Sequence, residues 1–289
     1  MNGAPDSSEW EMHAPLREAL QDASQRLASL PTARRDAELL LLGVLHRDRA
    51  WLLTHPEAEL SPDQLALYQG WIARRARHEP VQYILGEQEF FGLAMRVTPD
   101  VLIPRPETEH LVEALLERVP HEAPLRIADI GTGSGAIAVA LAHSLPHAHL
   151  TALDLSPAAL AVARENARRH GVSGRIRFHQ SDLLAAVQGE QFDAVVSNPP
   201  YVPATEDLER QVRDYEPAAA LFAGRDGLDI YRRLIPQARA ALVPGGWLLL
   251  EIGHGQRDAL AGLLSAWDEV SFLPDLAGIP RVAIGRRRG

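Results

Sequence analysis

Two reactive side chains are missing from this sequence of 289 residues, and each absence excludes a class of chemistry. Cysteine is absent, so the chain has no disulfide, no thiolate nucleophile and no cysteine-ligated metal. Lysine is also absent, so all 29 residues counted as lysine or arginine are arginine. Schiff-base catalysis through a lysine amine is therefore excluded.

The sequence also lacks an apolar run long enough to span a bilayer, and it has no N-terminal signal peptide pattern. Together with the missing cysteine, this predicts a cytoplasmic protein that does not engage a membrane. The net charge is −9, whereas proteins that grip duplex nucleic acid usually present a basic face. We therefore expect no direct binding to duplex nucleic acid.

The first third of the chain has helical periodicity. After a loose polar tail over residues 1–12, apolar residues from Pro15 to about Leu85 recur at helical spacing, which predicts a bundle of four or five short helices. Thr32 and Ser61 are expected to cap two of them. This part defines a predicted N-terminal domain, 1–85.

A short extended region follows the helical part. Residues 89–97 and 101–103 are apolar runs split by Thr98-Pro99-Asp100, which predicts a β-hairpin linker within 86–108. Thr108 is then expected to cap a helix over 109–119. The remaining residues, 109–289, form the predicted third part.

Strands and helices alternate from Leu125 onward, which is typical of an α/β domain with a parallel sheet. The last two predicted strands form a closing antiparallel pair. The strands are expected at 125–130, 148–154, 175–179, 192–197, 246–252, 270–273 and 281–284.

Asn198-Pro199-Pro200-Tyr201 follows an apolar strand, at the position where open α/β sheets bind ligands. A planar NH2 group offers two donors, and the Asn198 side-chain oxygen with a neighbouring backbone carbonyl can accept both. The prolines carry no competing N–H, and Tyr201 offers a flat face for a planar group. The motif therefore predicts a site for a planar amide or base.

A glycine turn ends the first sheet strand, at Gly131-Thr132-Gly133-Ser134-Gly135. The next two strands end at Asp154 and Asp182, so these residues and Asn198 are expected to share one rim. A glycine turn with an acidic ribose clamp admits NAD or S-adenosylmethionine. The GxGxG spacing, Asp182 and the Asn-Pro-Pro-Tyr motif favour S-adenosylmethionine over the GxGxxG dinucleotide binders.

These motifs resemble class I methyltransferases that alkylate planar nitrogen, and further motifs resemble one family in particular. From about residue 35 to the end, the chain is similar to the bacterial release factor glutamine methyltransferases (PrmC/HemK family). The resemblance is carried by Pro80–Gly86, Glu89–Gly92, Leu102–Glu109, Tyr215–Pro217, Leu221–Gly224, Asp226–Leu228, Glu251–Gly253 and Asp275–Arg281.

The resemblance implies an α/β fold: a seven-stranded class I methyltransferase (Rossmann-like) sheet with a small N-terminal helical bundle and a β-hairpin linker. It implies methyl transfer from S-adenosylmethionine to the side-chain amide nitrogen (N5) of the glutamine in the Gly-Gly-Gln loop of peptide chain release factors. The helical domain would help to hold the release factor. The alternatives are an N6-adenine nucleic-acid methyltransferase and a non-enzymatic scaffold that binds the cofactor.

The expected site contains no metal. Its catalytic residues are Asn198, Pro199 and Tyr201, and its substrate-binding residues are Asn198, Pro199, Pro200 and Tyr201. The expected cofactor-binding residues are Asp129, Gly131, Thr132, Gly133, Ser134, Gly135, Asp154, Leu155, Asp182, Leu183 and Asn198. Leu183 stands where some relatives carry an aromatic residue, which leaves a ring contact to adenine open.

Three carboxylates near the site have two interpretations each. Glu107 and Glu109 either form a catalytic pair or fix the linker and approach the cofactor, and the second is preferred. Asp129 either satisfies the glycine turn or contacts the cofactor amino group, and the second is slightly preferred.

Overall fold

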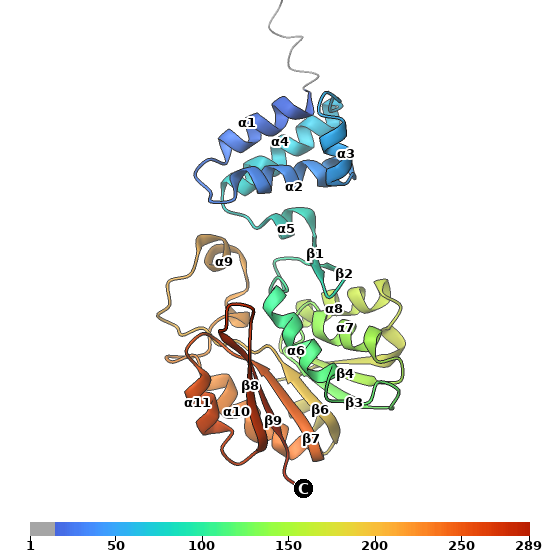
Figure 1. The fold of residues 1–289 in the computed structure, drawn as a ribbon, viewed down its shortest axis with the longest axis vertical. Coiled ribbons are helices and arrows are strands. Elements are labelled where there is room, and N and C mark those ends of the chain that lie inside the picture. Colours follow the sequence, from blue (N-terminus) through green and yellow to red (C-terminus); the bar gives the residue numbers. More distant parts are fainter. Residues whose placement is uncertain (1–14) are drawn as a thin grey trace, which may run out of the picture. The chain divides into compact units, whose positions relative to one another are not determined.

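The computed structural model describes residues 15–289, so the predicted polar tail over 1–12 lies outside the described residues. The described chain divides into two compact units (Figure 1). The smaller unit runs up to Gly86 and also contains Arg210–Tyr215, and the larger unit contains Glu87–Glu209 and Glu216–Gly289.

The smaller unit is a helical bundle, as the periodicity predicts. Ser61 caps a helix through a capping box: its hydroxyl accepts from the Gln64 backbone N–H at 3.3 Å, and the Gln64 side chain accepts from the Ser61 N–H at 3.0 Å. Thr32 occupies an N-cap position, but its hydroxyl donates to Asp36 at 2.8 Å and caps no backbone N–H. The helices are α1 Leu16–Arg26, α2 Ala33–Leu45, α3 Arg49–Thr54, α4 Pro62–Ala76 and α5 Val81–Leu85.

One helix of this unit comes from far along the chain. Helix α9, Arg210–Tyr215, joins the bundle, where the Tyr215 hydroxyl donates to the Arg77 carbonyl at 2.8 Å. The Arg210 guanidinium lies 3.1 Å from the His78 ring nitrogen Nε2. The sequence carries no signal for this excursion, because α9 is only six residues long.

The larger unit is built on a seven-stranded sheet with the strand order β5-β4-β3-β6-β7-β9-β8. Strands β3 to β7 pair in parallel, and β9 runs antiparallel to both of its neighbours, β7 and β8. All seven predicted strands are confirmed. Their bounds are β3 Arg126–Ile130, β4 His149–Asp154, β5 Ile176–Gln180, β6 Phe192–Ser197, β7 Leu242–Glu251, β8 Asp268–Pro274 and β9 Pro280–Arg286.

Two apolar cores cover the faces of this sheet, because successive side chains on a strand point to opposite faces. Ile127 on β3 packs into one core with α6 (Pro106–Leu116), α7 (Ala136–Ser144) and the end of α8 (Pro157–Arg169). Its neighbour Ala128 packs into the other core with α10 (Asp229–Ala241) and α11 (Arg257–Leu263). The sheet is therefore the middle layer of a three-layer sandwich (Figure 1).

The hairpin exists, but its position differs from the prediction. Strands β1 Glu87–Phe90 and β2 Leu93–Arg96 pair antiparallel around Phe91 and Gly92, and residues 101–103 form no strand. Both turn residues have positive φ, 51° and 73°, as a type I′ hairpin turn requires. Phe91 is an unusual residue at such a position, so the turn has no Asn-Gly or Asp-Gly signal in the sequence.

The start of α6 also differs from the prediction. The helix begins at Pro106, with Arg105 at the N-cap, so Thr108 lies inside the first turn and does not cap the helix. Proline is favoured at the first helical position, where its missing N–H costs nothing. Within the described residues, no helix combines the length and the apolar character that crossing a bilayer would need.

Candidate active site

A cavity of about 430 Å³ opens at the carboxyl ends of the parallel strands of the larger unit. β3 pairs with β4 on one side and β6 on the other, so the strand order reverses there, which is the usual ligand position in open α/β sheets. Of the predicted residues, the cavity is lined by Gly131, Thr132, Gly133, Ser134, Asp154, Leu155, Asp182, Leu183, Asn198, Pro199 and Pro200. Asp129, Gly135 and Tyr201 are not among the lining residues.

The glycine turn needs glycine for backbone reasons. Gly131, Gly133 and Gly135 have φ values of 69°, 55° and 82°, a region that side chains disfavour. A Cβ on Gly135 would also lie 3.0 Å from the Cβ of Ala163 on α8. The turn can therefore approach a ligand closely while α7 and α8 pack tightly behind it.

Asp154 holds this turn from the neighbouring strand. One carboxylate oxygen accepts from the Gly133 N–H at 2.9 Å, and the other accepts from the Ser156 N–H at 2.8 Å. Each carboxylate oxygen has further acceptor capacity. Asp154 can therefore bind hydroxyl groups in the cavity while it shapes the turn.

Asp129 lies fully buried behind the same turn. Its Oδ2 accepts from the Thr132 hydroxyl at 2.6 Å, and its Oδ1 has no hydrogen-bond partner among the described residues. Burial raises the pKa of Asp129 to about 7, and the Thr132 hydrogen bond opposes the shift. The Thr132 contact matches the turn interpretation, and the open Oδ1 matches a cation nearby.

The third strand contributes Asp182 and Leu183 at the rim. The Asp182 carboxylate forms an ion pair with Arg233 at 2.5 Å, with both side chains about half exposed. Leu183 adopts a positive φ of 52°, which is rare for a branched aliphatic residue. The backbone thus bends sharply where these two residues enter the cavity wall.

Asn166 is a structural residue of the site that the sequence did not reveal. It is fully buried on α8, where its side-chain oxygen accepts from the Arg96 N–H at 2.7 Å. Its Nδ2 donates to the carbonyls of Ser134 at 2.8 Å and Arg96 at 3.0 Å. Asn166 therefore ties the hairpin and the glycine turn to one helix.

Asn198 is linked to a buried carboxylate through a hydroxyl. Its Nδ2 donates to the Thr108 Oγ1 at 3.1 Å, and the Thr108 hydroxyl donates to Glu251 Oε2 at 2.5 Å. The other Glu251 oxygen accepts from the Tyr201 hydroxyl at 3.3 Å. No role for Glu251 was predicted, although a charged residue at the end of an apolar strand is the available signal in the sequence.

Glu251 is almost completely buried, with 2% of the residue exposed. Burial raises the pKa of Glu251 to about 7, while the hydrogen bonds from Thr108 and Tyr201 oppose the shift. Burial, and then the Glu251 charge, raise the pKa of the Tyr201 phenol well above its usual value. The Tyr201 hydroxyl therefore stays protonated and acts as a donor.

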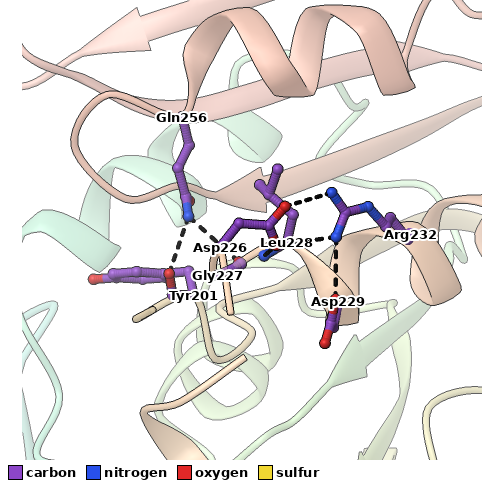
Figure 2. A network of polar contacts seen from close by, with 7 residues as sticks. All are labelled: Tyr201, Asp226, Gly227, Leu228, Asp229, Arg232 and Gln256. Atoms are coloured by element: carbon purple, nitrogen blue, oxygen red, sulfur yellow. Dashed lines mark hydrogen bonds and ion pairs between the residues drawn. The ribbon is translucent and has the colours of Figure 1, made fainter. Parts of the chain in front are cut away.

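The backbone of Tyr201 is held from a different direction (Figure 2). The Gln256 side chain donates to the carbonyls of Tyr201 at 3.0 Å and Gly227 at 3.3 Å, and it accepts from the Gly253 N–H at 2.9 Å. A Cβ on Gly227 would lie 2.2 Å from the Tyr201 oxygen. The Gln256 side chain thus joins three loops: the loop after β6, which holds Tyr201, the loop before α10, which holds Gly227, and the loop after β7, which holds Gly253.

Arg232 fixes the Gly227 loop on its outer side (Figure 2). Its guanidinium donates to both carboxylate oxygens of Asp226, at 2.6 and 3.0 Å, and to Asp229 at 3.1 Å. Asp226 also accepts from the Leu228 N–H at 3.2 Å. These contacts stabilise the loop before α10, on which the Tyr201 carbonyl rests.

Two further carboxylates support the cavity wall. Glu216 is buried, and it accepts from Arg105 at 2.5 Å and from the Ile103 N–H at 3.3 Å. Glu109 accepts from the Phe91 N–H at 2.9 Å, which fixes the hairpin. Glu107 and Glu109 do not line the cavity, so the geometry gives no support to a catalytic pair.

The residues present fit S-adenosylmethionine. Glycines leave the backbone open to close approach, Asp154 and Asp182 offer acceptors, and Asp129 keeps one buried oxygen without a partner. Asp154 and Asp182 line the cavity, where they would accept hydrogen bonds from the cofactor, and Asp129, which is buried behind the glycine turn, would face its cationic amino group. Among residues 15–289, no cluster of histidine, aspartate or glutamate could hold a metal ion.

Comparison with known proteins identifies both parts of the chain. Residues 18–86 match the PrmC N-terminal domain, and residues 108–214 match the methyltransferase small domain. The chain is 49% identical over 277 residues to the release factor glutamine methyltransferase of Koribacter versatilis, covering 94% of this chain and 98% of that protein. It is 47% identical over 258 residues to that of Geobacter sulfurreducens, covering 88% and 89%.

Solved structures agree on the fold. The T. thermophilus 16S rRNA N2 G1207 methyltransferase, in complex with AdoMet and guanosine, matches with a TM-score of 0.53 at 20% identity, covering 70% of this chain and 50% of that one. The hMettl16 catalytic domain, in complex with a MAT2A 3′UTR hairpin, matches with a TM-score of 0.54 at 17% identity, covering 82% and 92%. These likenesses confirm the α/β fold with its Rossmann-like sheet.

Proposed function

Since this chain belongs to the release factor glutamine methyltransferase family, we propose that it methylates the side-chain amide nitrogen (N5) of the glutamine in the Gly-Gly-Gln loop of peptide chain release factors. The methyl donor is S-adenosylmethionine, which supplies an electrophilic methyl group on a sulfonium. The protein acts in translation termination, in the cytoplasm.

The observation that carries this function is the orientation of Asn198. Its NH2 group faces Thr108, so its oxygen is the end of the amide that is free to accept from a substrate in the cavity. The Pro199 carbonyl lies next along the chain and offers a second acceptor. A primary amide has two N–H donors, so these two acceptors match a glutamine side chain and repel a glutamate carboxylate.

Positioning is the main contribution of the chain to the reaction. An amide nitrogen is a weak nucleophile because its lone pair is delocalised, and holding reactants in line can supply about 7–11 kcal/mol of a barrier. Asn198 and Pro199 hold the two amide hydrogens, and we assign the ring of Tyr201, which lies outside the cavity lining, to packing against the substrate amide. The amide nitrogen gains the methyl group as the sulfonium–methyl bond breaks, which leaves a neutral thioether. The nitrogen loses one hydrogen as a proton, which leaves after transfer and needs no dedicated base.

The smaller unit is part of the proposal. We assign the helical domain, 1–85, to holding the release factor, the linker 86–108 to connecting it, and 109–289 to the chemistry. The site residues named in the sequence analysis keep their predicted roles here. The cavity-lining positions of eleven of them, from Gly131 to Pro200, support this assignment.

The test is methyl transfer with labelled cofactor to a release factor, to its Gln→Glu variant in the Gly-Gly-Gln loop, and to DNA and RNA. We expect transfer to the first alone. Asn198→Ala should lower single-turnover transfer about 10²–10³-fold, the typical cost of losing a positioned polar group, while calorimetric cofactor affinity falls much less. Transfer to nucleic acid with none to release factor would instead establish an N6-adenine methyltransferase.

A further inference from the structure

We propose that Thr108 and Glu251 are positioning residues that fix the Asn198 amide with its oxygen toward the cavity, and thereby set the preference for a glutamine amide over a carboxylate. The inference rests on the proposed function and extends it to two residues outside the Asn-Pro-Pro-Tyr motif. We call the hydrogen-bonded residues Asn198, Thr108 and Glu251 the relay. Three elements contribute to it: α6 carries Thr108, the end of β6 leads to Asn198, and β7 ends at Glu251.

The Thr108 hydroxyl has a single proton to donate. Burial raises the pKa of Glu251 to about 7, and above that pH its ionised carboxylate can only accept. Glu251 Oε2 lies 2.5 Å from Thr108 Oγ1, so the hydroxyl proton is then committed to Glu251. Thr108 Oγ1 then offers only lone pairs to its other neighbour. The group that Asn198 presents at 3.1 Å must therefore be its NH2.

The side-chain oxygen of Asn198 lies at the other end of the same amide. The side-chain amide is planar, so fixing its NH2 on Thr108 fixes the direction of its oxygen as well. A reversed amide would place the Asn198 oxygen against Thr108 lone pairs and would send two N–H donors into the cavity. Because a buried donor or acceptor without a partner costs about 1–3 kcal/mol, the reversed state is disfavoured.

Further hydrogen bonds hold Glu251 itself in place. Its backbone carbonyl accepts from the Tyr231 hydroxyl at 2.7 Å, and its Oε1 accepts from Tyr201 at 3.3 Å. The charges that act on its carboxylate are those of Glu107 and Arg281, of opposite sign. The acceptor end of the relay is thus anchored through its backbone and through both side-chain oxygens.

A reversed Asn198 would change the chemistry of the cavity. Two N–H donors would then face the substrate, a pattern that suits a carboxylate better than an amide. Both residues therefore act on selectivity and rate through Asn198, Glu251 from outside the cavity and Thr108 from its lining. Because Thr108 also lines the cavity, an unchanged cofactor affinity in its variants is what separates this role from a direct contact with the cofactor.

The test compares Thr108→Val, which removes the hydroxyl at nearly constant shape, with Thr108→Ser, which keeps it. We expect Thr108→Val to lower single-turnover transfer about 10–100-fold, because small misplacement of a reacting group has costs of that order. Cofactor affinity should stay within about twofold, and Thr108→Ser should recover most of the rate. Equal rates for Thr108→Val and wild type, or equal losses in the two folded variants, would overturn the relay.

A second readout is independent of activity. The sequence contains only three asparagines, Asn2, Asn166 and Asn198, so asparagine-selective ¹⁵N labelling yields three side-chain amide signals. The Asn198 signal should lose its hydrogen-bonded shift and exchange protection in Thr108→Val and keep them in Thr108→Ser. Asn166, whose Nδ2 donates to Ser134 and Arg96, is the internal control for folding.

The two readouts separate the two proposals. If the wild-type protein fails to methylate release factor while the Asn198 signal responds as expected, the proposed function is wrong and the relay stands. If wild type methylates release factor and the Asn198 signal is the same in all three proteins, the function stands and the relay is wrong.

Discussion

The Asp154 carboxylate accepts from the Gly133 N–H at 2.9 Å across two neighbouring strands, so the residue that we propose to bind the ribose also shapes the glycine turn. Asp154→Ala removes both functions at once. We expect cofactor affinity to fall at least tenfold by calorimetry, since hydrogen bonds to a charged group contribute about 1.5–3 kcal/mol. Asp154→Asn, which keeps one acceptor, should lose less, and an unchanged affinity in Asp154→Ala would remove this residue from the cofactor site.

Tyr201 contributes a ring and a hydroxyl, which two substitutions separate. Tyr201→Phe removes only a 3.3 Å hydrogen bond to Glu251 and should lower transfer mildly. Tyr201→Ala also removes the ring that we assign to packing against the substrate amide and should lower transfer severely. Single-turnover rates for both variants check this, and equal damage from the two would exclude a role for the ring.

Gly227 should be intolerant of any side chain for reasons of space. A Cβ there would lie 2.2 Å from the Tyr201 oxygen at a φ of 75°. Gly227→Ala should therefore lower the free energy of unfolding by about 1–3 kcal/mol and reduce methyl transfer with it.

Gly255→Ala is the matched control for this prediction. Gly255 has a similar φ of 79°, but a Cβ at this position would meet no other atom within 4 Å, so its replacement tests backbone strain alone. Urea unfolding and transfer rates should show a clearly smaller loss for Gly255→Ala. Equal losses would show that backbone strain causes the effect and that the clash with the Tyr201 carbonyl oxygen does not contribute.

The buried Glu251 carboxyl should make stability depend on pH. Burial raises its pKa from 4.5 to about 7, so the folded state holds a proton that the unfolded state releases between these values. The stabilising contribution is complete below about pH 4.5 and is lost as the pH rises through 7. The loss amounts to roughly 3 kcal/mol by linkage.

Glu251→Gln isolates this contribution from that of Asp129, whose pKa is also raised to about 7. Urea unfolding between pH 4.5 and 8 should show wild type losing stability relative to Glu251→Gln as the pH rises. Glu206→Gln, at an exposed position, should run parallel to wild type. A constant difference between wild type and Glu251→Gln would contradict the shift.

The strands and the cavity rim could be predicted because their signals are local. Asp154 and Asn198 each follow an apolar strand, and parallel strands bring their carboxyl ends to one edge. Thr108 could not be placed in this way, because its partner Glu251 lies 143 residues further along the chain. Asn166 and α9 were missed for the same reason, since their roles depend on contacts that no local pattern encodes.

The hairpin was misplaced for a different physical reason. Its turn relies on Phe91 in a positive-φ conformation, held by a hydrogen bond from its N–H to Glu109. Tertiary contacts thus impose a turn that the local preference of phenylalanine would not choose. The predicted break at Thr98-Pro99-Asp100 has turn-forming residues but no second strand after it.

The chain that follows Tyr201 pairs with a later segment of the same unit, and α9 lies between the two in sequence. Val202 donates to the Leu221 carbonyl and accepts from Ala223, both at 2.9 Å, and Ala204 donates to Gly224 at 2.8 Å. The segment 205–220 therefore starts and ends at one pair of hydrogen-bonded backbone stretches, 202–204 and 221–224, which we call the clasp. A protease cut between residues 205 and 215 would leave both sides of the clasp in place, so a nicked protein should retain its cofactor pocket as two associated fragments.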